Sequence, residues 1–487
     1  NPPIVSYYIA LAAYLFGWSE VSLHLAFLVP ACGVVIGTWL LAKDFCSRPF
    51  FASLSVICTP VFLVSATTLM CDVLMLAFWI FAVIFWRRGI KTDNMMQIAY
   101  ASVLIVLAIL TKFSAVCLIP LLLAYSLLEK RKISFWILFL FFPIVVLGIY
   151  EWVTYSFYGT GHLTYIHSFT ESAKQIRQYK YVSGITTGIS FVGGCILFPV
   201  FYIFVFHKKF KIIIGFAIVV LLLIWLMSFG ALVDYPIADA DGVNWSFAVQ
   251  LSVFVFSGAC FFYFVLKSFI QKRDSDSFLI FLWVVGVFTF STVINWSVNG
   301  RSILPIVPVA GIFVIRHFEQ LESDLFVANF TRLYVPLILT LLIGLTVSFA
   351  DYKWALVSRN AAIRLSSDYR KNPGNLWYEG HWGFQYYMST FGRGKPLDYE
   401  KPLLIKGDLI IVPSFNSNTK PIFKSTACYM QELCFDVPGP ISTMNMKYGA
   451  GFYADLAGPL PFAFGPPMLE KYYVYKMIIN KKSKFNY

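Results

Sequence analysis

Three charged residues could do chemistry together, because each one interrupts an apolar stretch. They are Asp72 in TTLMCDVLML (67–76), Lys112 in AILTKFSAVCLIP (108–120) and Arg301 in NWSVNGRSILPIVP (295–308). A carboxylate can orient or deprotonate a hydroxyl group. Lysine binds phosphate as a point charge, and arginine binds it through two parallel hydrogen bonds. If the three meet, they suit group transfer from a phosphate-linked donor, because cations offset charge on a leaving phosphate.

Each of these residues also has a structural interpretation. Asp72 could be the N-cap of a helix that starts at Val73, since aspartate is a favourable cap. Lys112 could extend its ammonium to a membrane interface, and Arg301 could anchor a lipid headgroup. The combination on one face indicates chemistry more strongly than any single member does.

Weaker candidates lie in two polar segments. Asp239 and Asp241 form a D-x-D in DYPIADADG (234–242), and carboxylate oxygens can bind a divalent metal. A divalent metal therefore stays open as a cofactor. His162, His167 and Glu171 match no standard site, so an amphipathic helix at the membrane surface is favoured for that segment.

The composition predicts a polytopic membrane protein. The chain is 59% hydrophobic and 13% charged, whereas soluble domains contain roughly 25% charged residues. Its formal charge of +13 follows from cytoplasmic loops rich in Lys and Arg. Basic patches with interleaved aromatic residues are absent from the sequence, so no nucleic-acid partner is expected.

A spanning helix needs roughly 20 apolar residues, and on this criterion we expect about 12 spans. They lie near 22–43, 50–66, 73–88, 96–110, 113–128, 133–150, 186–206, 212–230, 248–266, 277–295, 303–315 and 333–350. Residues 4–17 are aromatic-rich and too short to cross, which favours an interfacial helix.

Basic residues in the loops fix the expected orientation. Most loop Lys and Arg fall on one side, as in RRGIK (87–91), EKRK (129–132) and HKKFK (207–211). The positive-inside rule makes that side cytoplasmic. Asp72, Lys112 and Arg301 then lie on the outer face, and so does the tail after the last span.

The tail has a different character from the rest of the chain. Residues 351–487 carry Gly and Pro punctuation and strand-like runs at 408–413 and 472–479, whereas 375–397 is typical of a strand, a turn and a helix. We therefore expect a transmembrane domain over 1–350 and an exported α/β or α+β domain over 351–487. Cys428 and Cys434 could form a disulfide in an exported tail.

Several segments, taken in order, resemble the GT-C superfamily of integral-membrane glycosyltransferases. They are NPPIVSYYIALAAYLFG (1–17), SATTLMCDVLML (65–76), LAILTKFSAVCLIP (107–120) and GRSILPIVPVAGI (300–312). The branch that they resemble contains the protein mannosyltransferases and the aminoarabinose transferase of lipid A (glycosyltransferase family 39-like). EGHWGFQYY, GDLIIVP and GPLPFAFG also look like the exported C-terminal domain of some bacterial members.

The resemblance implies an activity and assigns roles. Such enzymes transfer a sugar, with inversion, from a polyprenyl-phosphate donor to a lipid, glycan or protein acceptor on the outer face of the membrane. Asp72 matches the family's second acidic position, Lys112 its carrier-phosphate lysine, and Arg301 a second phosphate ligand. The family's main catalytic acid precedes the segment that begins at Asn1, so we expect it in residues missing before Asn1. The expected location is a bacterial inner membrane, with the tail in the periplasm.

Two other classes stay open. Intramembrane charges also suit a transporter or flippase of a lipid-linked saccharide. Transporters usually contain related halves, and no internal repeat is visible in the sequence. An O-antigen ligase or polymerase would share the lipid-linked chemistry, but the Asn-Pro-Pro and Thr-Lys segments argue against it.

Overall fold

The computed structural model describes residues 2–206, 209–228, 233–236, 238–239, 242–321, 330–392, 394–399, 402–417, 419–422, 424–466 and 468–481. The chain forms two compact units. Unit 1 comprises Asn1–Ser348 and Thr443–Ala463, and unit 2 comprises Phe349–Ser442 and Phe464–Tyr487. The expected domain division between residues 350 and 351 stays a prediction, and it did not anticipate that residues 443–463 pack with unit 1.

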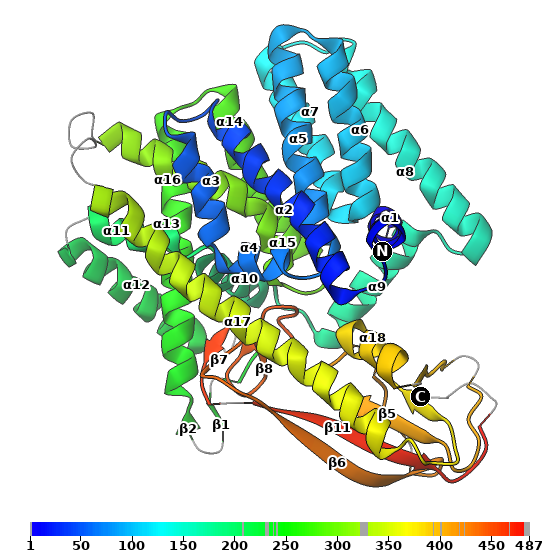
Figure 1. Ribbon diagram of the computed structural model, residues 1–487. Coiled ribbons are helices and arrows are strands. Elements are labelled where there is room, and N and C mark those ends of the chain that lie inside the picture. The colour runs from blue at the N-terminus through cyan, green and yellow to red at the C-terminus, as the bar shows by residue number, and fades with distance from the viewer. Residues whose placement is uncertain are drawn as a thin grey trace. The chain divides into compact units, whose positions relative to one another are not determined.

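Unit 1 is built almost entirely from helices (Figure 1). In chain order they are α1 (Ile4–Phe16), α2 (Glu20–Ala42), α3 (Pro49–Cys58), α4 (Pro60–Ala66), α5 (Cys71–Thr92), α6 (Met95–Thr111), η1 (Phe113–Cys117), α7 (Leu118–Lys130), α8 (Trp136–Tyr158), α9 (His162–Arg177), α10 (Tyr181–Ile196), α11 (Phe198–Phe206), α12 (Lys209–Ser228), α13 (Trp245–Gln271), α14 (Ser275–Thr289), η2 (Phe290–Ile294), α15 (Gly300–Ile303), η3 (Leu304–Ile306), α16 (Val307–Leu321) and the first part of α17 (Phe330–Asp368).

The helices confirm a polytopic membrane protein, but they do not confirm about twelve spans. Among the described residues, 8 helices are long and apolar enough to cross a membrane, or up to 10 if each bent helix pair is one span. Several expected spans are short or broken instead. The segment 96–110 lies on α6, which has 17 residues, and 50–66 and 186–206 are the two bent pairs.

Local sequence explains both bends. Pro60 begins α4 and has no N–H to continue α3, so the two helices meet at an angle of 68°. Leu197 has a positive φ of 54° between α10 and α11, and Pro199 follows it in the first turn of α11. These helices diverge by 75°.

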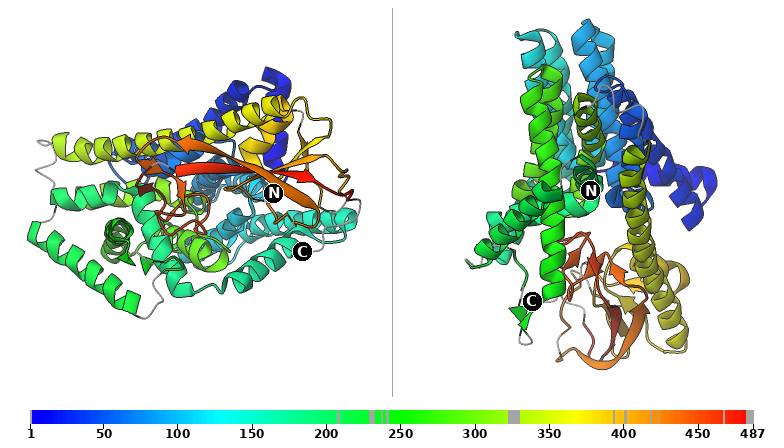
Figure 2. Two further views of the ribbon diagram at one scale, coloured as in Figure 1. Left: turned by 90° about the horizontal axis from the view of Figure 1, so that it is seen from below. Right: turned by 90° about the vertical axis from the view of Figure 1, so that its left-hand side faces the viewer.

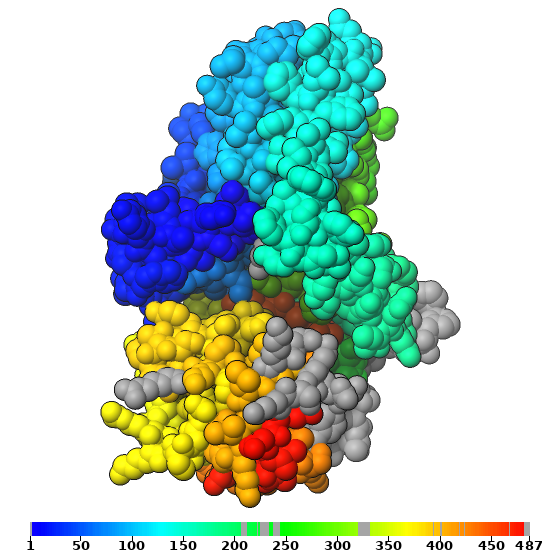
Figure 3. All heavy atoms as spheres, turned by 90° about the vertical axis from the view of Figure 1, so that its right-hand side faces the viewer, coloured from blue at the N-terminus to red at the C-terminus, as the bar shows by residue number. Residues whose placement is uncertain are grey.

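The helices of unit 1 differ strongly in burial. The apolar window of Gly300–Glu319 is 94% buried and that of α5 is 78% buried, whereas that of α8 is 17% buried. Figure 2 shows the long helices running side by side, and the space-filling view in Figure 3 shows α8 and α9 forming an outer surface. Most exposed α8 side chains are apolar or aromatic, such as Phe142, Ile149 and Trp152, as expected for a surface that faces lipid.

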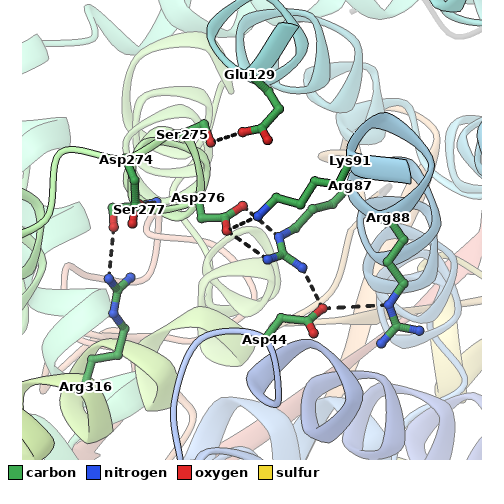
Figure 4. Close-up of polar contacts among 10 residues, drawn as sticks. All are labelled: Asp44, Arg87, Arg88, Lys91, Glu129, Asp274, Ser275, Asp276, Ser277 and Arg316. Atoms are coloured by element: carbon green, nitrogen blue, oxygen red, sulfur yellow. Dashed lines mark hydrogen bonds and ion pairs between the residues drawn. The ribbon is translucent and has the colours of Figure 1, made fainter. Parts of the chain in front are cut away.

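A polar cluster ties four helices of unit 1 together at the end opposite Asp72 on α5 (Figure 4). Arg87 on α5 donates to Asp276 at the start of α14 through Nε (2.7 Å) and Nη2 (2.8 Å). It also donates to Asp44, just after α2, at 2.6 Å. Arg316 on α16 donates to Ser277 at 2.9 Å. These contacts of Arg87 and Arg316 join the ends of neighbouring helices.

Residues 443–463 contribute a short hairpin to unit 1. It contains β8 (Met444–Asn445) antiparallel to β9 (Ala450–Gly451). The Tyr235 hydroxyl donates to the Met446 carbonyl at 2.6 Å. The ring centroids of Phe462 and Phe254 on α13 lie 4.9 Å apart. A second hairpin of unit 1 pairs β1 (Ala238–Asp239) with β2 (Gly242–Val243).

Unit 2 is an α+β fold around a five-stranded mixed sheet with the order β4-β3-β5-β11-β6. β3 lies parallel to β4 and β5, whereas β11 lies antiparallel to β5 and β6. The last part of α17 and α18 cover one face of the sheet, where Leu365, Tyr387 and Tyr472 are among the core residues. The strands and helix are β3 (Leu376–Tyr378), α18 (Trp382–Phe391), β4 (Lys395–Pro396), β5 (Leu409–Pro413), β6 (Ala427–Val437) and β11 (Met468–Met477), with the short β7 (Ile441–Ser442) and β10 (Ala463–Phe464) paired beside them.

The tail confirms the expected local structure but not the possible disulfide. The strand and the helix expected over 375–397 are β3 and α18, and the two expected strands at 408–413 and 472–479 are β5 and β11. The short strand β4 was not expected. Cys428 and Cys434 are both free. They lie on the same strand, where six residues span roughly 20 Å, too far for a sulfur–sulfur bond.

Candidate functional site

Asp72 lies in the first turn of α5 and is completely buried. The expected alternative, an N-cap for a helix starting at Val73, is wrong because α5 begins at Cys71 after Met70. The positive end of the helix dipole favours a carboxylate in this turn. Burial of a charge is tolerated only when partners compensate it, and Asp72 has two such partners.

Lys112 is the first partner. It ends α6 with an extended backbone (φ −154°, ψ 127°) before the short helix η1. This change of direction turns the side chain toward α5, and Lys112 Nζ lies 2.5 Å from Asp72 Oδ1. Because 27% of the lysine side chain is still exposed, its ammonium remains within reach of a ligand.

Arg301 is the second partner. It lies on α15, whose N-cap residue Asn299 accepts a hydrogen bond from the Ser302 N–H at 2.8 Å. Arg301 Nη1 lies 3.8 Å from Asp72 Oδ2 and also contacts Met70 Sδ. The Nε atom of Arg301 is buried and has no hydrogen-bond partner in the described part of the chain. The guanidinium therefore keeps one donor for a further acceptor.

A small cavity lies against the two cations. It is lined by Lys112, Arg301, Ser114 and Ser302 on its polar side and by apolar residues that include Trp79 and Phe290. Its volume of about 10 Å³ is close to the minimum for one water molecule. The cavity itself is therefore too small for a sugar or a polyprenyl chain.

The two aspartates predicted as weak metal ligands lie only partly within the described residues. Asp239 lies on β1, but its side chain is outside the described part of the chain, as is the whole of Asp241. Among the described residues, no group of three or more His, Cys, Asp or Glu could hold a metal ion. A metal site at Asp239 and Asp241 stays a prediction.

The segment with His162, His167 and Glu171 forms the expected helix, α9. The carboxylate of Glu151 accepts hydrogen bonds from the N–H groups of Leu163 (2.7 Å) and Thr164 (3.0 Å). Glu151 therefore holds the start of α9. The Nδ1 atom of His162 lies 2.9 Å from the Tyr150 hydroxyl oxygen.

Sequence reasoning missed the residues that surround Arg301. The pattern Asn-Gly-Arg-Ser (299–302) is typical of a capped helix start and could have indicated the role of Asn299. The ring of Tyr453 lies 5.7 Å from the Arg301 guanidinium carbon. That contact joins residues 152 positions apart, and nothing in the local pattern indicates it.

The N-terminal part of the chain is similar to one known family. Residues 1–155 match the family model described as dolichyl-phosphate-mannose-protein mannosyltransferase. This match confirms the predicted resemblance to membrane glycosyltransferases over the segment that contains Asp72 and Lys112. Arg301 lies outside the matched residues. No curated protein sequence matches the chain.

The chain is also similar to solved structures at low identity. ArnT from Cupriavidus metallidurans bound to undecaprenyl phosphate is 12% identical, with a TM-score of 0.41 over 85% of this chain and 83% of that one. The Archaeoglobus fulgidus oligosaccharyltransferase in its apo form is 12% identical, with a TM-score of 0.42 over 81% of this chain and 56% of that one.

Proposed function

We propose that this protein is a glycosyltransferase that moves a sugar from a polyprenyl-phosphate donor to an acceptor on the outer face of the membrane. One observation carries the proposal: the buried carboxylate of Asp72 has the cations of Lys112 and Arg301 at 2.5 Å and 3.8 Å. The family match over residues 1–155 supports the reaction class.

The two cations are assigned to the donor phosphate. Lys112 is partly exposed, and Arg301 Nε, beside the same cavity, has no hydrogen-bond partner among the residues that the structure describes. When the donor binds, a phosphate oxygen would approach the Lys112 ammonium and share this cation with Asp72. The cations then stabilise the charge that grows on the phosphate as it leaves.

The transfer step is a displacement at the sugar's anomeric carbon. The bond from this carbon to the phosphate oxygen breaks, and a bond to the acceptor's hydroxyl oxygen forms. Polyprenyl phosphate leaves with the electron pair, and the acceptor proton passes to a carboxylate base. Asp72 is assigned to orient the acceptor and to balance the two cations.

The decisive experiment follows release of polyprenyl phosphate. The full-length protein in proteoliposomes is given polyprenyl-phosphate sugars with candidate lipid, glycan and peptide acceptors. We expect release that falls at least 100-fold, a magnitude within the range for removing an electrostatic contact in a transition state, in Asp72→Asn and Lys112→Ala. Lys130→Ala, which removes an ion pair with the exposed Asp93, is the matched control and keeps wild-type release.

Two outcomes would contradict the proposal. Donor that crosses the bilayer without release of polyprenyl phosphate would assign the protein to the flippases. Release that is unchanged in both variants would show that Asp72 and Lys112 take no part in the chemistry.

The outer-face location is tested by labelling. Cys428 and Cys434 are exposed on β6 of unit 2. A membrane-impermeant maleimide applied to intact cells should label the wild type at these residues, and Cys428→Ser/Cys434→Ser should lose that label. Labelling of β6 only after permeabilisation would place unit 2 on the cytoplasmic side and reverse the proposed topology.

A further inference from the structure

Arg301 is held by a part of the chain that is far away in sequence. The Gly300 N–H, one residue before Arg301, donates to the Phe452 carbonyl at 2.8 Å. The Tyr453 ring lies 5.7 Å from the Arg301 guanidinium carbon. Both residues belong to the segment Thr443–Ala463, which packs within unit 1. The position of α15 therefore depends on the position of this segment.

Asp455 fixes the segment to the loop that precedes α15. Its N–H donates to the Val298 carbonyl at 3.0 Å, and its Oδ1 accepts from the Ser297 hydroxyl at 2.8 Å. The Asp455 side chain is almost entirely buried, with 2% of its surface exposed. A buried carboxylate has little freedom to move when its oxygens are all engaged.

Arg177, at the end of α9, completes this arrangement. It donates to Asp455 Oδ1 through Nη1 (2.8 Å) and to Oδ2 through Nη2 (3.0 Å). Such a two-point pair fixes orientation as well as distance. Arg177 also lies 3.6 Å from Asp234 Oδ2, and burial is the largest cause of the raised pKa of the Asp234 carboxyl.

We infer that Asp455 is a positioning residue, which acts through the 297–300 loop to hold Arg301 against Asp72 and the phosphate site. The chain of contacts runs from Arg177 to Asp455, then to Ser297 and Val298, and then to α15. Arg301 is therefore set by α9 and by the segment 443–463 together. The role in transfer rests on the proposed function, whereas the positioning itself does not.

The first test measures positioning without any substrate. Phenylglyoxal modification of Arg301 is followed by mass spectrometry on the full-length protein in detergent, with the exposed Arg364 on α17 as the internal reference. We expect several-fold faster modification of Arg301 in Asp455→Asn than in the wild type. Asp72→Asn, which removes a direct partner of Arg301, is the positive control.

Asp234→Asn is the matched negative control. Asp234 contacts the same arginine, but its described contacts do not reach the 297–300 loop, so Arg301 should react at the wild-type rate. If Asp455→Asn does not fold, Ser297→Ala removes a single hydrogen bond to Asp455 and should accelerate modification in the same direction. Unchanged modification of Arg301 in the folded variants would overturn the inference.

The second test asks whether Asp455 acts through Arg301. In a double-mutant cycle, Asp455→Asn should reduce transfer several-fold in the wild-type background and cause no further loss in Arg301→Gln. Equal losses in both backgrounds would mean that Asp455 supports folding in general and would overturn the inference. If the wild type itself shows no transfer, the proposed function fails, and the modification experiment still decides the positioning.

Discussion

Lys112 Nζ lies 2.5 Å from Asp72 Oδ1, and the two side chains differ in burial: none of the Asp72 side chain is exposed, against 27% of Lys112. The pair is therefore asymmetric. Lysine without its partner can extend toward water, whereas aspartate without lysine keeps a buried charge with Arg301 at 3.8 Å.

This asymmetry predicts unequal losses of stability. Lys112→Met should lower the free energy of unfolding by roughly 3 kcal/mol, because the buried charge of Asp72 loses its nearer partner and keeps only Arg301 at 3.8 Å. Asp72→Asn should cost only about 1 kcal/mol, because the amide is neutral and can accept a hydrogen bond from Lys112. Thermal unfolding midpoints in detergent measure both changes. Equal shifts in the two variants would argue against the asymmetry.

Arg87 should be among the residues of unit 1 on which stability depends most. Its guanidinium pairs with Asp44 and Asp276, and only 7% of its side chain is exposed. Arg87→Met leaves two acids without this partner and should cost roughly 3–5 kcal/mol. Arg88→Gln is the matched control: Arg88 is 40% exposed and lies 3.7 Å from Asp44, so its loss should cost under about 1 kcal/mol. Midpoints of thermal unfolding that fall equally would contradict this ranking.

Two glycines set how closely α10 and α13 approach. A methyl group on Gly258 would lie 2.2 Å from the Ile189 carbonyl oxygen, and one on Gly193 would lie 1.8 Å from that of Phe254. Small residues at helix crossings in membranes allow such backbone contact. Gly258→Ala should therefore destabilise unit 1 by roughly 1–3 kcal/mol through overpacking.

Gly286 on α14 provides the control for this experiment. Among the described residues, no atom lies within 4 Å of a methyl group placed there. Gly286→Ala should leave the thermal midpoint unchanged or raise it, because alanine favours a helix over glycine by roughly 0.5–1 kcal/mol. A fall equal to that of Gly258→Ala would show that helix crossing is not the cause.

Unit 2 should lose stability as the pH rises through neutrality. Burial raises the pKa of the Glu379 and Glu470 carboxyls from an ordinary 4.5 to about 7. Between pH 4.5 and pH 7 the folded protein binds more protons than the unfolded chain. The two protonated carboxyls therefore stabilise the fold fully below about pH 4.5, and this stabilisation is lost as the pH rises to about 7. Hydrogen exchange across β5 and β11 in the full-length protein should be slower at pH 5.5 than at pH 8.

Glu470→Gln should weaken this dependence, because an amide has no charge to bury at high pH. Glu432→Gln is the control: Glu432 is paired with Lys471 at 2.8 Å, and its pKa is lowered by hydrogen bonds from Lys471 and Cys434. Glu432 therefore stays ionised between pH 5.5 and pH 8. Exchange rates of β11 that do not change between pH 5.5 and pH 8 in the wild type would contradict the prediction.

The sequence by itself determined the class of fold and the residue types of the candidate site. Apolar runs of spanning length must become helices in a membrane, because every backbone polar group needs an internal partner there. The strand-like runs at 408–413 and 472–479 likewise predicted β5 and β11, because their residue types favour strands. Asp72, Lys112 and Arg301 were recognisable because charges are costly in such surroundings.

Only the tertiary structure decided which of these side chains meet. Arg301 and Asp72 are 229 positions apart, and the bend at Leu197 changes the course of the chain between them. Residues 443–463 lie after most of unit 2 in the chain, yet they pack in unit 1 and bring Asp455 to Arg177. Such contacts depend on how helices pack around a shared core rather than on local pattern, so no spacing in the sequence indicates them.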